Sequence, residues 1–169
     1  MYYATRRKVF ISYHHRRDQG CFDRFTQLFA EHYEIFYDNS LDGRVRSDDP
    51  EYAKRAIPEE HGVGSSITIV LCGAETWKRK YVDWEIHSTL HREHAPLGIA
   101  LPTAARGGRG GIVVADRLHE NIQSRFAYWL SSWTSDPVAL HSAIEAAIYL
   151  SRDTPKIRND RPKMERNLA

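Results

Sequence analysis

Residues 66–73 read Ser-Ile-Thr-Ile-Val-Leu-Cys-Gly, and residues 81–86 read Tyr-Val-Asp-Trp-Glu-Ile. The first segment is a short apolar run rich in β-branched residues and bounded by glycine, which is typical of a strand buried on both faces of a parallel sheet. From Val82 to Leu90 the apolar residues recur at helical spacing. This stretch therefore predicts a strand, a tight turn and a helix whose apolar side faces the sheet.

Glu85 occupies an unusual position on the predicted helix. On a wheel of 3.6 residues per turn it lies beside Tyr81 and Ser88, about 40° from the edge of the apolar arc, so its carboxylate is expected at a boundary rather than in open water. Open α/β sheets bind ligands at the carboxyl ends of their strands, where this helix begins. Glu85 is therefore the first candidate for chemistry. The alternative is a half-exposed glutamate that pairs with a neighbouring arginine or lysine.

The rest of the chain alternates between strand and helix patterns. Further strands are expected at residues 8–13, 33–37, 95–102 and 125–130. A polar loop, His14–Asp18, follows the first strand, and further helices are expected at residues 21–32, about 50–56 and 137–148. This order predicts an α/β, flavodoxin-like, three-layer fold with a five-stranded parallel sheet of order 2-1-3-4-5 and helices on both faces.

The expected strand order places the first and third strands beside a switch point, where such sheets bind ligands. Three segments that follow strands are expected to line one crevice there, namely Ser12–His14, Asp38–Ser40 and Cys72–Trp77. Glu85 is expected at the wall of this crevice.

Length and composition limit the number of domains and the classes of partner that we expect. A chain of 169 residues with 41% hydrophobic residues predicts one domain, residues 1–151, and a polar, charged tail at 152–169 that is either loosely ordered or folded over the surface. The sequence shows neither an apolar run that would span a bilayer nor a signal-type N-terminal core, so we expect a cytoplasmic protein without membrane contact. A net charge of +2 does not by itself imply nucleic acid. Cys21 and Cys72 form no metal motif.

A glycine-rich stretch at residues 103–111 includes Arg106 and Arg109. Such a segment can cradle a phosphate through backbone N–H groups and guanidinium charge. It fits no P-loop pattern, so a flexible linker is the favoured interpretation and a ligand-touching or mobile loop is the alternative.

Three motifs follow one another along the first part of the chain. They are Val9–Tyr13, Phe36–Asp38 with its loop, and Ser66–Leu71 followed by Tyr81–Ile86, in which an aromatic residue precedes a glutamate by four positions. In this order they resemble the Toll/interleukin-1 receptor (TIR) superfamily, and especially the bacterial TIR-like proteins of the Thoeris antiphage system, the ThsB type. The resemblance covers roughly residues 7 to 100.

The resemblance implies an enzyme that cleaves the bond between nicotinamide and ribose in NAD, with Glu85 as the catalytic carboxylate. Departure of nicotinamide leaves an oxocarbenium-like ribose, whose positive charge a nearby carboxylate stabilises. NAD is then a substrate, and no cofactor is implied. The expected product is an ADP-ribose derivative, cyclic or conjugated by the same resemblance, that signals to a separate effector protein in antiphage defence. The sequence does not decide which nucleophile captures the ribose, and capture by water would give linear ADP-ribose. The resemblance also makes a homo-oligomer a possible state.

Eight further residues are candidates for substrate binding. Tyr13 and Trp77 are candidates to stack on the nicotinamide or adenine ring. The remaining six are expected near the ribose or phosphates, or at the wall of the crevice: Ser12, His14, Asp38, Asn39, Arg44 and Tyr81. For each of them, capping, loop or surface duty is the structural alternative.

Other functions remain in competition. A TIR-like interaction module without catalysis would assemble through the loop Asp38–Arg46, and a third possibility is NAD binding without turnover. A receiver domain is rejected because the first strand runs into Ser12 rather than into an acidic pair. A metal site is not expected, since the histidines of the Glu85 helix lie on its solvent side. A further hypothesis is that the Gly107–Gly111 loop or the C-terminal tail covers the crevice and keeps the enzyme inactive until it is triggered.

Overall fold

The computed structural model describes residues 6–37 and 65–169 of the chain. A five-stranded sheet of order β2-β1-β3-β4-β5 forms its centre, and every neighbouring pair of strands is parallel. The strands are β1 (Arg7–Ser12), β2 (Tyr33–Phe36), β3 (Ser65–Cys72), β4 (Ala95–Ala100) and β5 (Tyr128–Leu130). The helices are α1 (His15–Phe29), α5 (Lys80–His91), α6 (Asp116–Gln123) and α7 (Pro137–Leu150), with short 3-10 helices η1 (Thr76–Lys78) and η2 (Thr154–Lys156).

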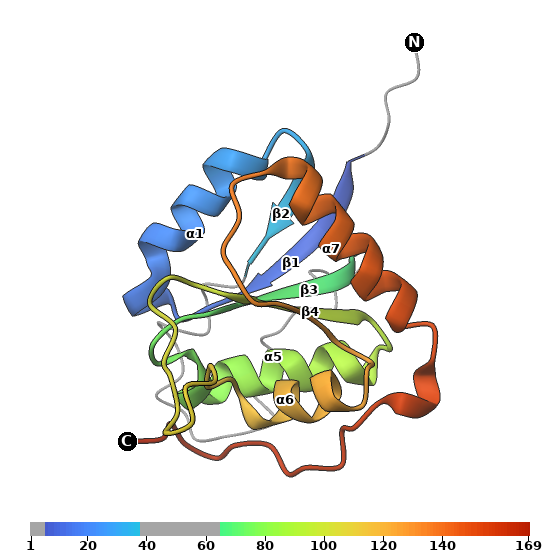
Figure 1. The fold of residues 1–169 in the computed structure, drawn as a ribbon. Helices are drawn as coiled ribbons and strands as arrows, with labels where there is room; N and C mark the ends of the chain where they lie inside the picture. Colours follow the sequence, from blue (N-terminus) through green and yellow to red (C-terminus); the bar gives the residue numbers. More distant parts are fainter. Residues whose placement is uncertain (1–5, 38–64) are drawn as a thin grey trace.

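The helices form a layer on each side of the sheet, α1 and α7 on one face and α5 and α6 on the other (Figure 1). Because successive side chains of a strand point to opposite faces of the sheet, the same strands contribute to a hydrophobic core on each face. Val9 and Ile11 of β1 pack beneath α1 and α7, whereas Val70 and Cys72 of β3 pack against α5 and α6. Each aliphatic side chain buried in this way stabilises the fold by about 1.5–3 kcal/mol. The predicted flavodoxin-like, three-layer fold with strand order 2-1-3-4-5 is confirmed.

Two elements differ from the sequence prediction. Helix α1 begins at His15, so the prediction of a polar loop at His14–Asp18 is wrong. These residues form the N-cap and first turn of the helix, and their polar side chains find partners near η1, where Asp18 accepts from Thr76 and Arg17 pairs with Glu75. Helix α6 was not predicted at all, because two of its buried residues, Arg117 and Asn121, are polar. The last helix starts as expected, with Asp136 accepting a hydrogen bond from the backbone N–H of Val138 at 3.0 Å.

The glycine-rich stretch folds as a small hairpin instead of the flexible linker that the composition favours. The backbone N–H of Gly107 donates to the carbonyl of Gly111 at 2.8 Å, and Arg106 pairs with Ile112 across an isolated antiparallel bridge. Gly110 has a φ of +82°, a left-handed conformation that glycine adopts without the steric cost of a Cβ.

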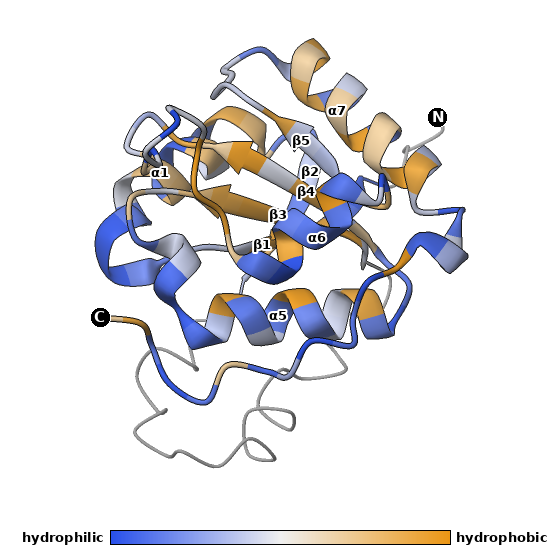
Figure 2. Ribbon diagram, turned by 60° about the horizontal axis from the view of Figure 1, so that its bottom comes forward, coloured by the Kyte–Doolittle hydropathy of each residue, from blue (hydrophilic) through white to orange (hydrophobic). Residues whose placement is uncertain are grey.

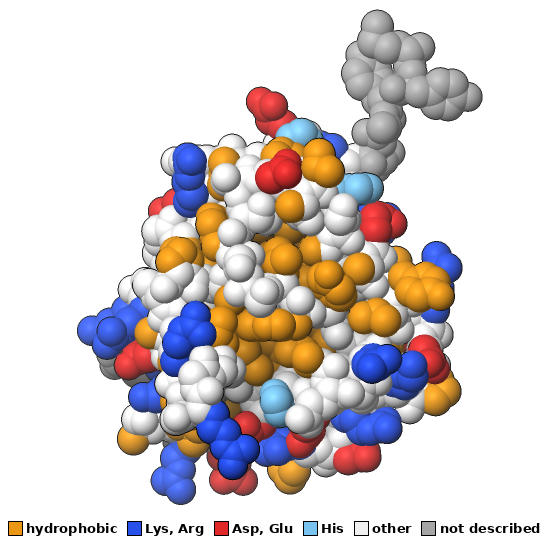
Figure 3. Space-filling view, viewed as in Figure 1, with side chains coloured by type: hydrophobic (Ala, Val, Ile, Leu, Met, Phe, Trp, Pro, Cys, Tyr) orange, Lys and Arg blue, Asp and Glu red, His pale blue; other side chains and the backbone are white. Residues whose placement is uncertain are grey.

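The C-terminal residues fold over the surface, which is one of the two alternatives expected for the tail. After α7 and η2 the chain returns along α5 as a largely hydrophilic segment (Figure 2). On the face seen in Figure 1, apolar side chains gather in the middle and charged side chains surround them (Figure 3). No helix in the described ranges is long and apolar enough to cross a membrane. The division of the chain at residue 151 stays a prediction.

Candidate functional site

The carboxyl ends of β1 and β3 lie side by side, because the two strands pair in parallel with Ser12 opposite Val70. From this edge the chain enters α1 on one face of the sheet and η1 and α5 on the other (Figure 1). Parallel α/β sheets bind ligands at such a switch point. The residues that follow β1 and β3 are therefore the first place to look for a site.

Glu85 lies in the middle of α5 and is only 3% exposed. The alternative of a half-exposed surface glutamate is therefore wrong. Asp83, two residues earlier, points in nearly the opposite direction, because two residues correspond to about 200° of helical rotation. Since Asp83 binds Arg117 of α6, with 2.8 Å between Oδ1 and Nε, Glu85 is directed away from α6.

Tyr81 lies one turn before Glu85 and therefore on the same side of α5. The residue is 8% exposed, and its ring meets the ring of Trp84 edge to face, with 5.9 Å between the ring centroids. The ammonium group of Lys80 stands 5.4 Å from the centroid of the Trp84 ring, a distance suited to a cation–π interaction. The residues before Glu85 are thus held in a packed aromatic environment.

Ser12 and Tyr13 point to opposite faces of the sheet, as consecutive residues at the end of a strand do. Ser12 is fully buried, and its Oγ has no hydrogen-bond partner among the described residues. A buried polar atom of this kind costs about 1–3 kcal/mol, which a ligand hydroxyl or phosphate oxygen would recover.

Tyr13 belongs to the core beneath α1. Its ring stacks on His15 and Phe22, with ring centroids 4.2 Å and 4.5 Å away, and its hydroxyl donates to Gln19 at 2.9 Å. Only 2% of the residue is exposed. That Tyr13 stacks on a substrate stays a prediction.

A cavity of about 430 Å³ opens at the starts of α1 and α5. Its lining is strongly basic and consists of His14, Arg16, Arg17, Glu75 and Arg79. His14 and Arg79 are the N-cap residues of α1 and α5, and neither helix start has a side-chain cap of its own. Two helix N-termini carry partial positive charge into the same cavity, in addition to the guanidinium groups. The cavity therefore suits an anion with several oxygens, such as a diphosphate.

A buried carboxyl group fixes the wall of this cavity. Asp18, in the first turn of α1, is 3% exposed and accepts a hydrogen bond from Oγ1 of Thr76 at 3.1 Å. Thr76 in turn accepts from the backbone N–H of Gly73 at 2.8 Å. Burial raises the pKa of Asp18 above its usual value, against the opposing effect of the hydrogen bond from Thr76. A side chain at Gly73 would lie 2.5 Å from Oδ1 of Asp18, so this contact requires glycine.

Trp77 is half-buried in η1, directly after the Asp18 contact, and Lys78 stands 5.3 Å from its ring centroid. The indole N–H of Trp77 is buried and meets no acceptor within the described part of the chain. His14 lines the basic cavity, whereas Trp77 is not among its lining residues. That either residue binds substrate stays a prediction. Asp38, Asn39 and Arg44 lie outside the described residues, as does the loop Asp38–Arg46 and the helix expected at 50–56.

The sequence analysis did not identify four residues at or beside this cavity as functional candidates, namely Arg16, Arg17, Arg79 and Asp18. The available signal was their position, because Arg16 and Arg17 lie within five residues of the end of the first strand and Arg79 directly precedes the Glu85 helix. Arg17 is also held by Glu75, with 3.1 Å between Nε and Oε2.

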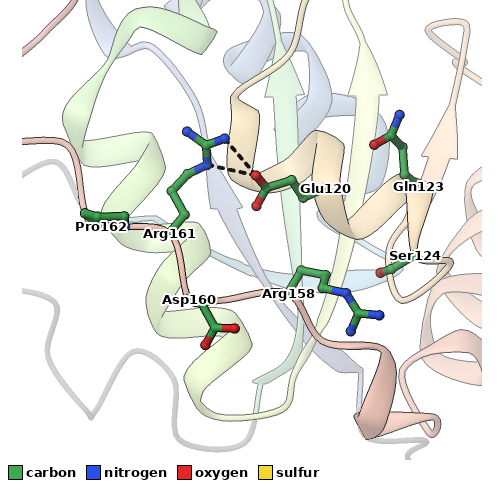
Figure 4. A pocket seen from close by; sticks show the side chains of 7 residues that line it. All are labelled: Glu120, Gln123, Ser124, Arg158, Asp160, Arg161 and Pro162. Atoms are coloured by element: carbon green, nitrogen blue, oxygen red, sulfur yellow. Dashed lines mark hydrogen bonds and ion pairs between the residues drawn. The ribbon is translucent and has the colours of Figure 1, made fainter.

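A larger cavity of about 730 Å³ lies away from these residues, between α6 and the C-terminal segment. Glu120 holds Arg161 at 2.7 Å on one side of it, and oppositely charged residues alternate around its rim (Figure 4). It contains none of the residues predicted to bind substrate. Its lining is Glu120, Gln123, Ser124, Arg158, Asp160, Arg161 and Pro162.

Metal-ligating side chains do not converge in the described ranges, where no group of three or more His, Cys, Asp or Glu is placed to hold an ion. On α5, the rings of His87 and His91 stack with 6.3 Å between centroids. Burial, helped by the charges of Arg117 and Lys163, lowers the pKa of His87 to about 4.

Comparison with known proteins gives a family match. The model of the family described as "Thoeris protein ThsB, TIR-like domain" matches residues 10–106, more than half of the chain. Among solved structures, the chain is similar to the TIR domains of the activated Roq1 resistosome directly recognising the pathogen effector XopQ. That similarity has 12% sequence identity and a TM-score of 0.39, and covers 86% of this chain and 83% of that chain. No curated protein matches significantly.

Proposed function

The chain belongs to the family of TIR-like domains of the Thoeris protein ThsB, and on this premise we propose that it is an NAD-processing enzyme of antiphage defence. It cleaves the bond between nicotinamide and ribose and makes a cyclic, ADP-ribose-derived signalling molecule. One observation carries the proposal beyond the family. A buried glutamate, Glu85, lies on the helix that starts at the arginine-lined cavity.

The spacing between these two features suits the substrate. Glu85 follows Arg79 by six residues, which corresponds to about 9 Å along the helix axis. A dinucleotide whose diphosphate lies among Arg16, Arg17 and Arg79 then has its nicotinamide ribose within reach of α5. His14 and the two helix N-termini add to the attraction for the diphosphate. Trp77 supplies an aromatic surface for the nicotinamide or adenine ring.

Glu85 acts on the charge that develops in the reaction. When the C1′–N bond breaks, its electron pair leaves with neutral nicotinamide, and the ribose becomes positively charged. A carboxylate in a site of low dielectric stabilises that charge more strongly than it would in water, and it binds the ribose hydroxyls. Attack by another nucleophilic atom of the same molecule closes the ring and gives the cyclic product. Attack by water would give linear ADP-ribose and a proton.

The product is proposed to act on a separate effector protein, with NAD as the only small-molecule partner of the catalytic step. Assembly into a homo-oligomer is compatible with this scheme. The competing function is a TIR-like module that associates through Asp38–Arg46 and catalyses nothing. NAD binding without turnover is the third outcome.

The decisive experiment incubates the purified protein with NAD and follows nicotinamide and the ADP-ribose products by mass spectrometry. We expect nicotinamide release by the wild type and its loss in Glu85→Gln. Glu93→Gln, which removes an exposed glutamate just beyond the end of α5, is the matched control and should retain activity. Saturable NAD binding without nicotinamide release would favour the non-catalytic binder, and neither binding nor release would favour the assembly module.

The diphosphate site has its own test. Arg16→Ala and Arg79→Ala should raise KM for NAD about tenfold or more, since each removes a charge-assisted hydrogen bond to phosphate worth about 1.5–3 kcal/mol. Arg92→Ala, at the opposite end of α5, is the control. An unchanged KM in both cavity variants would show that the diphosphate of NAD does not bind in this cavity.

A further inference from the structure

The last residues of the chain run along α5 in the opposite direction to the helix. Asn159 donates to the carbonyl of His87 at 3.2 Å near the end of α5. Farther on, the carbonyl of Met164 accepts from the indole N–H of Trp84 at 2.8 Å. Figure 2 shows this segment following α5 to the C-terminus. We call residues 158–168 the strap.

Arg117 connects the strap to α5 from the α6 side. Its guanidinium is fully buried and forms a two-pronged pair with Asp83, at 2.8 Å and 3.3 Å. The remaining N–H groups donate to three strap oxygens, which are Oδ1 of Asn159 and the carbonyls of Arg161 and Pro162, at 3.0, 2.9 and 3.1 Å. All five donors of this arginine are therefore used, three of them by the strap.

The strap also completes the start of α5. The first N–H groups of a helix lack partners within the helix, and Arg79 supplies no side-chain cap. Instead, the backbone N–H of Lys80 donates to Oδ1 of Asn167 at 2.9 Å. The backbone N–H of Leu168 donates to the carbonyl of Lys78 at 2.9 Å. A residue 87 positions away thus caps the helix that carries Glu85.

Asp83 receives a further hydrogen bond from the strap, from the backbone N–H of Met164 at 2.8 Å. Because Asp83 and Glu85 lie about 200° apart on the helix, these contacts fix the rotation of α5 about its axis from the side opposite Glu85. At a radius of about 5–6 Å, a rotation of about 20° moves a side-chain tip by about 2 Å. A misplacement of about 1 Å already costs about a hundredfold in rate.

We propose that the strap positions the Glu85 helix, with Asn167 and Arg117 as positioning residues for the reaction. The activity part of this inference rests on the proposed function. This role differs from that of a C-terminal cover that blocks the crevice and inhibits the enzyme, because loosening such a cover would raise activity. Loosening the strap lowers it.

The test uses full-length variants at Asn167. Asn167→Ala removes the cap, whereas Asn167→Asp keeps an acceptor oxygen in the same place. Glu165→Ala is the matched control, because Glu165 is an exposed strap residue with no hydrogen bond or ion pair among the described residues. Two readouts are made on each protein: hydrogen exchange of the amides in residues 80–86, with α7 as internal reference, and kcat and KM for NAD.

We expect Asn167→Ala to speed exchange at the start of α5 about tenfold, the effect of one lost cap, while α7 is unchanged. Its kcat should fall with little change in KM, and Asn167→Asp and Glu165→Ala should match the wild type. Arg117→Lys, which keeps the charge but loses the two-pronged geometry, should loosen the same residues further.

Unchanged exchange in Asn167→Ala would overturn the capping role. Faster exchange with unchanged kcat would overturn the link to catalysis, and higher activity in Asn167→Ala would establish a cover instead. If the wild type turns over no NAD, the proposed function fails, while the exchange experiment still decides whether the strap holds α5.

Discussion

Arg117→Met is the substitution whose effect the structure predicts most fully. It removes the buried guanidinium and leaves Asp83, whose side chain is 3% exposed, with the N–H of Met164 as its remaining donor among these groups. Breaking a buried ion pair from one side costs about 3–5 kcal/mol, because an uncompensated charge remains in the interior. The strap carbonyls lie near the surface and can turn to water, so we expect the lower part of that range, about 3 kcal/mol.

The assay is urea unfolding followed by tryptophan fluorescence. A loss of about 3 kcal/mol is a large share of the roughly 5–15 kcal/mol that keeps a domain folded. It should lower the melting temperature by about 6–12 °C in a chain of this length. Arg161→Met is the control. Its guanidinium pairs with Glu120 and Asp116 at the surface, so less than about 1 kcal/mol should be lost.

A double variant separates the buried charge from simple loss of packing. Asp83→Leu combined with Arg117→Met removes both charges and should recover part of the stability lost in Arg117→Met alone. If the free energy of unfolding of Arg117→Met lies within about 1 kcal/mol of the wild-type value, the buried pair does not hold the strap and α6 to α5.

Three further outcomes follow from individual contacts. Gly73→Ala should destabilise the protein by about 1–3 kcal/mol in urea unfolding because its Cβ would press on Asp18, and adding Asp18→Ala should relieve most of the loss. His87 has a pKa of about 4 in the folded protein against 6.5 as the ordinary value, so the unfolded chain binds its proton first and stability is lost as the pH falls from 6.5 towards 4. His87→Gln should flatten that loss in unfolding curves measured across this range, and an unchanged slope would contradict the assignment. Burial raises the pKa of the Cys72 thiol to about 12, so a thiol reagent should label the half-buried Cys21 first and Cys72 only after unfolding, as peptide mass mapping would show.

The strands of the sheet and the helix that contains Glu85 could be predicted from the sequence, because both leave a periodic pattern of apolar residues. The run from Ile67 to Leu71 is buried throughout, and the helical spacing after Val82 matches α5. Hydrophobic periodicity is a local property, so it is readable without knowledge of the partners.

Helix α6, the strap and the basic cavity escaped prediction because their stability depends on distant polar partners. Arg117 is fully buried, although arginine is normally a surface residue, and its burial requires Asp83 and the strap. The strap binds largely through backbone atoms, which leave no pattern in the side chains. The basic cavity is likewise assembled from the starts of two helices far apart in sequence.

Catalysis by Glu85 is tested most directly by mass spectrometry of NAD and its products in cells that carry the gene, before and after phage infection. Cells with Glu85→Gln and Glu93→Gln serve as the paired variants. We expect an ADP-ribose-derived product with the mass of a cyclic form in infected wild-type and Glu93→Gln cells and its absence in Glu85→Gln cells. The same metabolite pattern in wild-type and Glu85→Gln cells after infection would contradict catalysis by Glu85.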